Sequence, residues 1–127
     1  MITEPPIGII VTLPMRFFEE YDYRKYIREH EAMNDPENDS CWFRVMKNLP
    51  TWDVLYVYTC YGGRIRHRTN FGWLVRNEHL AFTRPEGGIR DFGKANAVVM
   101  VGPYVKAPIR IQQKGFQGFR YVIKELW

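Results

Sequence analysis

Residues 53–69 read Asp-Val-Leu-Tyr-Val-Tyr-Thr-Cys-Tyr-Gly-Gly-Arg-Ile-Arg-His-Arg-Thr and contain the main structural element that we predict from this sequence. Residues 54–61 are rich in β-branched and aromatic side chains, which suit a pleated and packed strand. Gly62 and Gly63 follow, and two glycines supply the positive φ angles that a two-residue hairpin turn needs. The stretch therefore predicts a β-hairpin around which the rest of the chain is organised.

The register predicted for this hairpin places three arginines in a row. With the two glycines as the turn, the facing pairs are Tyr61 and Arg64, Cys60 and Ile65, Thr59 and Arg66, and Tyr58 and His67. Because side chains alternate between faces along a strand, Arg64, Arg66 and Arg68 share one face, and Ile65 and His67 share the other. Guanidinium groups spaced about 6.7 Å apart can neutralise phosphates. The alternative is that they form the solvated face of an exposed hairpin.

Length and composition indicate the class of protein. The chain has 127 residues, of which 16% are aromatic, and this predicts one packed globular domain with a single core. No apolar run approaches the roughly 18 residues that a membrane-spanning helix needs. The first residues lack the basic and apolar regions of a signal peptide. We therefore expect a cytoplasmic protein with no membrane partner.

Cysteines and histidines give no sign of a metal or cofactor site. Cys41 and Cys60 are the only cysteines, and two thiols in a reducing compartment are favoured over a disulfide or a zinc site. His30, at the end of a predicted helix, would favour the charged imidazolium through the helix dipole. His67 is expected among tyrosines as a satisfied, partly buried ring. No catalytic triad order or phosphate-binding glycine loop is present, so we expect no metal and no cofactor and assign no catalytic residue.

Charge is unevenly distributed along the chain. The residues up to Gly63 carry 6 basic and 10 acidic side chains, whereas those from Arg64 onward carry 12 basic and 4 acidic, which gives the net charge of +4. A basic surface beside an acidic one would attract a polyanion. Alternatively, the two halves interleave in space and their charges cancel locally.

The first third of the chain predicts one strand and one helix. Residues 7–13 are apolar and β-branched, which predicts a central strand. Residues 16–30 carry side-chain pairs at helical spacing, such as Glu20 and Arg24, and predict a helix that Thr12 is placed to cap. Residues 34–40 are a loop by composition.

The remaining elements are predicted from short apolar runs. Strands are expected at residues 41–46, 71–75, 97–101, 108–112 and 118–124. Gly72 predicts a bulge, and Gly102-Pro103 is expected to break a strand. Residues 83–93 contain Pro85 and the Gly87-Gly88 pair, which predicts an exposed loop. Many short strands and one main helix indicate the α+β class, as a small mixed β-barrel or half-barrel.

A second basic and aromatic stretch lies near the end of the sequence. Residues 114–122, Lys-Gly-Phe-Gln-Gly-Phe-Arg-Tyr-Val, interleave basic, glycine and aromatic side chains, as RNA-recognition motifs do. No second long helix follows, so that fold is excluded. Lys114, Phe116 and Arg120 are still candidates for contact with a planar ligand. The alternative is a tight turn feeding a core strand.

Part of the chain resembles the PUA-like superfamily, particularly its ASCH and EVE branches. The resemblance is carried by residues 49–58, Leu-Pro-Thr-Trp-Asp-Val-Leu-Tyr-Val-Tyr, by Gly63-Arg-Ile, and by residues 118–121, Gly-Phe-Arg-Tyr. It implies a single PUA-like domain over residues 1–127, a small barrel with flanking helices and a cleft for RNA or a modified nucleobase. Some ASCH relatives are enzymes acting on RNA or modified nucleosides. Trp52 replaces the glycine of the family's Gly-Asp step and the ASCH signature is absent, so no catalytic residue is transferred.

The leading hypothesis is a module that binds nucleic acid, with RNA favoured, or a modified nucleotide. Arg64, Arg66 and Arg68 would contact phosphates, and Trp73 would stack on a base. Two alternatives stay open. One is an enzyme acting on RNA or a nucleoside through an acidic residue of helix 16–30. The other is a protein-interaction module of a phage or mobile element, whose basic face meets an acidic protein.

Overall fold

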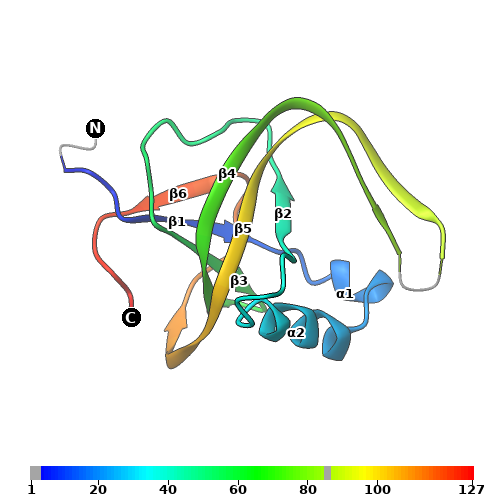
Figure 1. Cartoon of the computed structure of the whole chain (residues 1–127). Coiled ribbons are helices and arrows are strands. Elements are labelled where there is room, and N and C mark those ends of the chain that lie inside the picture. Colours follow the sequence, from blue (N-terminus) through cyan, green and yellow to red (C-terminus); the bar gives the residue numbers. More distant parts are fainter. Residues whose placement is uncertain (1–3, 85–86) are drawn as a thin grey trace.

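The computed structural model describes residues 4–84 and 87–127, and these form one six-stranded sheet that curls into a half-barrel with two short helices (Figure 1). The strand order is β2-β5-β4-β3-β1-β6. The strands are β1 (Gly8–Thr12), β2 (Trp42–Val45), β3 (Tyr56–Tyr61), β4 (Arg64–Thr83), β5 (Ile89–Gln112) and β6 (Phe119–Val122). Only β1 and β3 pair in parallel among the described strands. An α+β half-barrel, built mostly of strands, is thus confirmed.

The glycine pair makes the predicted hairpin turn. Gly62 and Gly63 have φ angles of 62° and 81°, in the left-handed region that glycine adopts without steric cost. Tyr61 faces Arg64 beside the turn, and the next pair also follows the predicted register. The turn and the start of both strands are therefore confirmed.

A bulge changes the register beyond that point. Arg66 has no partner on β3, so Thr59 faces His67 and Tyr58 faces Arg68. A bulge of one residue moves every later side chain of β4 to the opposite face. His67 therefore lies on the face of Thr59, and the predicted pairing of His67 with Tyr58 is wrong.

The predicted helix of residues 16–30 is two helices, α1 (Phe17–Glu20) and α2 (Tyr23–Ala32). Asp22 separates them because its side chain accepts a hydrogen bond from the backbone N–H of Lys25 at 2.8 Å, which caps α2. Thr12 caps neither helix. Its hydroxyl accepts a hydrogen bond from the backbone N–H of Phe116 at 3.1 Å instead.

The second half of the chain is dominated by two long strands. β4 continues through the predicted strand at 71–75, with a register shift at Gly72 that confirms the bulge there. β5 continues through Gly102-Pro103, where a break was predicted. This pair lies in a register shift against β4, between residues 101 and 105, so the missing N–H of Pro103 removes no ladder hydrogen bond.

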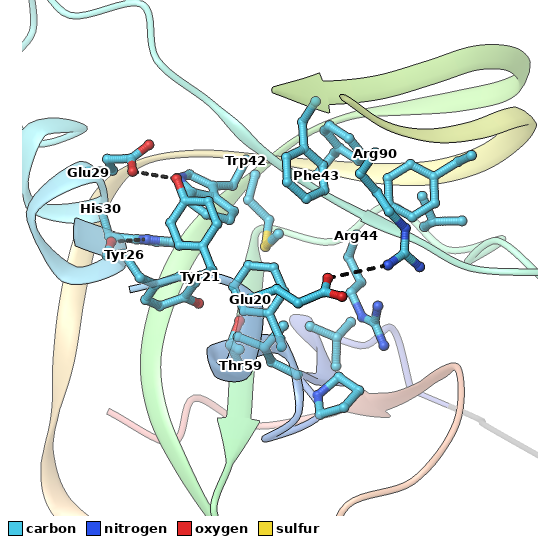
Figure 2. A pocket seen from close by; sticks show the side chains of 18 of the residues that line it. Glu20, Tyr21, Tyr26, Glu29, His30, Trp42, Phe43, Arg44, Thr59 and Arg90 are labelled. Atoms are coloured by element: carbon cyan, nitrogen blue, oxygen red, sulfur yellow. Dashed lines mark hydrogen bonds and ion pairs between the residues drawn. The ribbon is translucent and has the colours of Figure 1, made fainter. Parts of the chain in front are cut away.

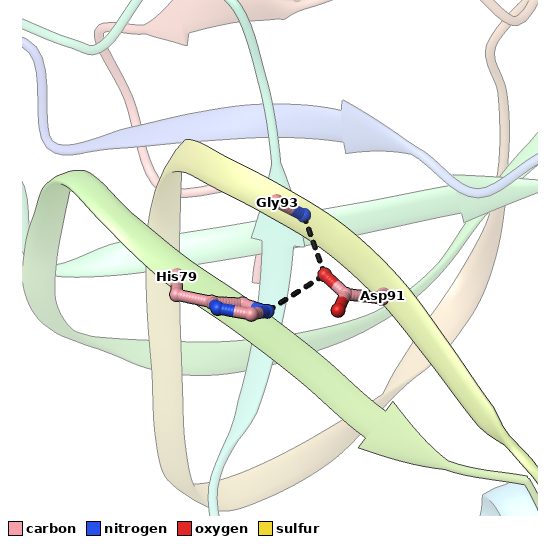
Figure 3. A network of polar contacts seen from close by, with 3 residues as sticks. All are labelled: His79, Asp91 and Gly93. Atoms are coloured by element: carbon pink, nitrogen blue, oxygen red, sulfur yellow. Dashed lines mark hydrogen bonds and ion pairs between the residues drawn. The ribbon is translucent and has the colours of Figure 1, made fainter.

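Residues 76–83 of β4 and 89–96 of β5 form a hairpin that we call the arm. It extends beyond the rest of the sheet and descends toward α1 (Figure 1). The loop predicted at residues 83–93 is wrong for residues 89–93, because these residues belong to β5. Pro85 and Glu86 of the predicted loop lie outside the described residues. Asp91 accepts hydrogen bonds at 2.7 Å from both His79 Nε2 and the backbone N–H of Gly93, which ties the two strands of the arm together (Figure 3).

The core lies on both faces of the sheet around β1. Ile9 and Val11 pack with Val57 on one face, whereas Ile10 packs with Tyr58 on the other. The acidic first half of the chain supplies β1, β2 and β3 and the basic second half supplies the rest, so the two halves interleave in the sheet. Across residues 4–84 and 87–127, no helix has the length and apolarity needed to cross a membrane.

Candidate ligand-binding pocket

A pocket of about 640 Å³ lies between the two helices, β2 and the arm (Figure 2). Its volume falls within the roughly 300–1,000 Å³ typical of small-molecule sites. Seven aromatic side chains line it, namely Phe17, Tyr21, Tyr26, Trp42, Phe43, Phe82 and Phe92.

These rings form a continuous set of contacts around the pocket. The ring centroid of Tyr21 lies 5.5 Å from that of Trp42 and 6.4 Å from that of Phe82. On the opposite side, Phe43 and Phe92 are 5.9 Å apart with nearly perpendicular planes. Edge-to-face contacts at these distances are favourable. The helices, β2 and the arm thus meet through aromatic rings that line the pocket.

Arg44 is one of the charged residues that line the pocket, and Figure 2 shows it beside Glu20 and Arg90. It is half-buried on β2 and has no carboxylate oxygen within 4.0 Å in the part of the chain that the structure describes. Burial lowers the pKa of its guanidinium, and repulsion from the nearby Arg16 lowers it further, while Tyr26 acts in the opposite direction. Arg44 and the exposed Arg16 both line the pocket, and neither forms an ion pair within the described residues.

Two of the three carboxylates that line the pocket have partners that also line it. Glu20 of α1 pairs with Arg90 of the arm at 3.7 Å, and Figure 2 shows this pair across the pocket. The Tyr21 hydroxyl donates a hydrogen bond to Glu29. Burial and this carboxylate raise the pKa of Tyr21 well above its usual range. Glu19 also lines the pocket and forms no ion pair with any described residue.

Two buried histidines lie at the inner end of the pocket. His30 lines it, is 1% exposed, and its Nδ1 lies 2.8 Å from the carbonyl oxygen of Tyr26. Burial lowers the pKa of His30 to about 4, so the ring is neutral and the predicted dipole-stabilised imidazolium is wrong. His67 lies behind it with ring centroids 5.0 Å apart, and neither of its ring nitrogens has a hydrogen-bond partner in the described chain. The prediction that His67 is satisfied is therefore also wrong.

The structure separates the three hairpin arginines. Arg64 faces Tyr61 and Arg68 faces Tyr58, and positions 58 and 61 point to opposite faces of β3. Arg66, in the bulge, turns back on the hairpin. Its Nε donates to the carbonyl oxygen of Tyr61 at 2.7 Å, and its guanidinium lies 4.9 Å from the centroid of that ring. The predicted row of three arginines on one face is therefore wrong.

Some of the other predicted site residues do come together. The guanidinium carbon of Arg120 lies 4.3 Å from the ring centroid of Phe116, so two of the three candidate residues from segment 114–122 are in contact. The third candidate, Lys114, is exposed. The side chains of Arg120 and Arg68 project from the same face of the sheet, because both residues belong to one row of paired positions that crosses β6, β1, β3 and β4.

The last residues of the chain cover part of that face. The guanidinium carbon of Arg68 lies 4.3 Å from the ring centroid of Tyr56. Nη1 of Arg68 donates a hydrogen bond to the main-chain oxygen of Trp127. Trp73 is 51% exposed and lies five residues farther along β4, where it faces Val99. None of the seven predicted binding residues lines the aromatic pocket.

Sequence reasoning missed the pocket because its lining comes from segments between residues 11 and 100. One local signal was present. Arg44 interrupts the apolar run at residues 41–46, where it is the one charged side chain. Cys41, also on the lining, is an exposed free thiol, and Cys60 is a buried one.

Within residues 4–84 and 87–127, no three His, Cys, Asp or Glu side chains are arranged to hold a metal ion. No protein-family model, curated protein or solved structure matches the chain, so the PUA-like relationship stays a prediction.

Proposed function

We propose that this protein binds a phosphorylated nucleoside in the aromatic pocket, either a free nucleotide or a nucleotide unit of single-stranded RNA. The observation that carries the proposal is Arg44, a half-buried cation that lines the pocket together with Arg16 and has no carboxylate oxygen within 4.0 Å in the described chain. A phosphate would be bound by both guanidinium groups and would relieve their mutual repulsion. Arginine forms bidentate, charge-assisted hydrogen bonds with phosphate.

The aromatic wall supports the same class of ligand. Bases stack on tyrosine, tryptophan and phenylalanine rings, and each stacked base contributes about 1–3 kcal/mol. Tyr21, Trp42 and Phe82 offer such rings in one wall of the pocket. The combination of the half-buried Arg44, the exposed Arg16 and flat apolar walls suits a ligand with a phosphate at one end and a planar group at the other.

The test compares Arg44→Gln with Arg110→Gln, which removes the same charge from an exposed position of β5 outside the pocket. Calorimetric titrations would use adenosine and uridine monophosphates, a short single-stranded RNA, and inorganic phosphate. Loss of a hydrogen-bonded charge worth about 1.5–3 kcal/mol predicts a Kd raised by roughly 10- to 100-fold in Arg44→Gln. Arg110→Gln should bind as the unaltered protein does.

Comparing these ligands distinguishes a free nucleotide from a nucleotide unit of RNA. Tighter binding of RNA than of mononucleotides identifies a nucleotide unit within RNA, whereas the reverse identifies a free nucleotide. Equal affinities of the two arginine variants would contradict the proposal, as would the absence of binding to every phosphorylated nucleoside.

A second candidate function is catalysis on the same ligand. Glu19, Glu20 and Glu29, all within the segment predicted to supply an acidic catalytic residue, line the pocket beside Arg44. A carboxylate there is placed to act as a general base. Turnover of RNA or a nucleoside that Glu20→Gln abolishes, and Glu37→Gln on the exposed loop does not, would support this function. Binding without turnover would contradict it.

A further inference from the structure

The inner end of the pocket contains a hydrogen-bond acceptor whose identity follows from geometry. His30 Nδ1 is 2.8 Å from the Tyr26 carbonyl oxygen, and a carbonyl oxygen can only accept. Nδ1 must therefore carry the hydrogen of the neutral ring, and Nε2 must be the nitrogen with a free lone pair. No described residue donates a hydrogen bond to Nε2, and the ring forms part of the pocket lining.

A hydroxyl lies in the same region without a partner. Thr59 of β3 is 4% exposed and lines the pocket, and its Oγ1 makes no hydrogen bond in the described chain. The neighbouring Thr69, on the same face of the sheet, is equally buried but donates to the carbonyl oxygen of Val57 at 3.3 Å. A buried threonine on this face is therefore able to satisfy its hydroxyl, and Thr59 does not.

Buried polar groups without partners are rare in folded proteins, and each requires an explanation. Here the unpartnered Thr59 hydroxyl shares the pocket lining with His30, and both ring nitrogens of His67, directly behind His30, are also buried without partners. Their clustering argues against an isolated packing defect. His67 does not line the pocket, so we assign it no contact with a ligand.

We infer that the inner end of the pocket reads the hydrogen-bonding edge of a nucleobase, with His30 Nε2 accepting from a ring or exocyclic N–H and Thr59 completing the pattern. The inference rests on the proposed function and adds the class of planar group. The group must carry an N–H donor beside a second polar atom, which a nucleobase has and a plain aromatic ring lacks. The phosphate lies at Arg16 and Arg44, and the base extends inward past the aromatic wall.

The experiment measures the preference for a base rather than overall affinity. Calorimetry would compare adenosine and uridine monophosphates with ribose 5-phosphate, which has the sugar and phosphate without the base. Thr59→Val removes only the unpartnered hydroxyl, and Thr69→Val is the control that removes a satisfied one from the same face. Thr59→Ser retains a hydroxyl and should restore the preference.

The inference predicts that Thr59→Val lowers the affinity for the preferred mononucleotide by about tenfold and leaves ribose 5-phosphate unaffected. Thr69→Val should change neither. Arg44→Gln should weaken both ligands equally, which separates the two proposals. An unaltered mononucleotide affinity in Thr59→Val would overturn the inference while leaving the proposed function intact. Equal binding of ribose 5-phosphate and both mononucleotides by the native protein would overturn it as well.

Discussion

Acidification from pH 8 to pH 5 should destabilise the fold through its buried histidines. The pKa of His30 is about 4 in the folded protein, against an ordinary value of 6.5. At pH 5 the unfolded chain therefore takes up a proton at this position and the folded chain does not. The stabilisation is complete above pH 6.5 and is lost as the pH falls toward 4.

The magnitude follows from this difference in pKa. Integrating proton uptake between pH 8 and pH 5, at about 1.4 kcal/mol for each unit of pKa, gives a loss of about 2 kcal/mol from His30 alone. His67 acts in the same direction, because burial and the nearby His30 lower its pKa well below the usual value. Asp91 contributes little here, since its lowered pKa affects stability only below its ordinary value of 3.8.

Urea denaturation at a series of pH values, followed by circular dichroism, measures this loss directly. His30→Gln has no titrating ring and should reduce the difference between pH 8 and pH 5 by about 2 kcal/mol. The control is His79→Gln, which removes an exposed imidazole from the arm and should keep the loss. Equal stability of the native protein at pH 8 and pH 5, or the same loss in His30→Gln, would refute the assignment of neutral buried rings.

Three further predictions concern the fold itself. Thr59→Val should raise the free energy of unfolding by about 1 kcal/mol because it removes an unpartnered buried hydroxyl. Thr69→Val should lower the free energy of unfolding by about 1 kcal/mol because it removes the hydrogen bond to the Val57 carbonyl oxygen. Urea denaturation that ranks the two variants in the reverse order would contradict this prediction. Gly63→Ala should cost about 1 kcal/mol at its φ of 81°, and Gly63→Asn less, so thermal melts with no difference between them would argue against strain at the turn. Gly102→Ala should destabilise the fold by about 3 kcal/mol or more, because a Cβ at this position overlaps the carbonyl oxygen of Met33. An unchanged Tm would show that the end of α2 and β5 are not in this close contact.

Local signals in the sequence predicted the parts of the fold that depend on neighbouring residues. Gly62-Gly63 specified the turn, and the apolar run at 97–101 specified a buried strand. The bulge at Arg66 has no comparable signature, because an arginine has no special preference for that position. One inserted residue was enough to place Arg64 and Arg68 on opposite faces.

The pocket was beyond such reasoning for a different physical reason. Its aromatic wall joins Phe17, Trp42 and Phe82, which are brought together only when the arm folds down toward α1. No periodicity relates residues so far apart in sequence. The tautomer of His30 likewise depends on a single contact with Tyr26 and on burial that only the folded chain provides.

Ligand binding in the aromatic pocket can be tested by nuclear magnetic resonance of the tryptophan indole N–H groups during titration with adenosine monophosphate. Trp42 lies in the aromatic wall, whereas Trp73 is exposed on β4 and Trp127 covers the face of Arg68. Binding beside Arg44 predicts a saturable shift of the Trp42 signal, with those of Trp73 and Trp127 unchanged. Shifts of Trp73 or Trp127 with a static Trp42 would contradict the account and place the ligand on the outer surface of the sheet.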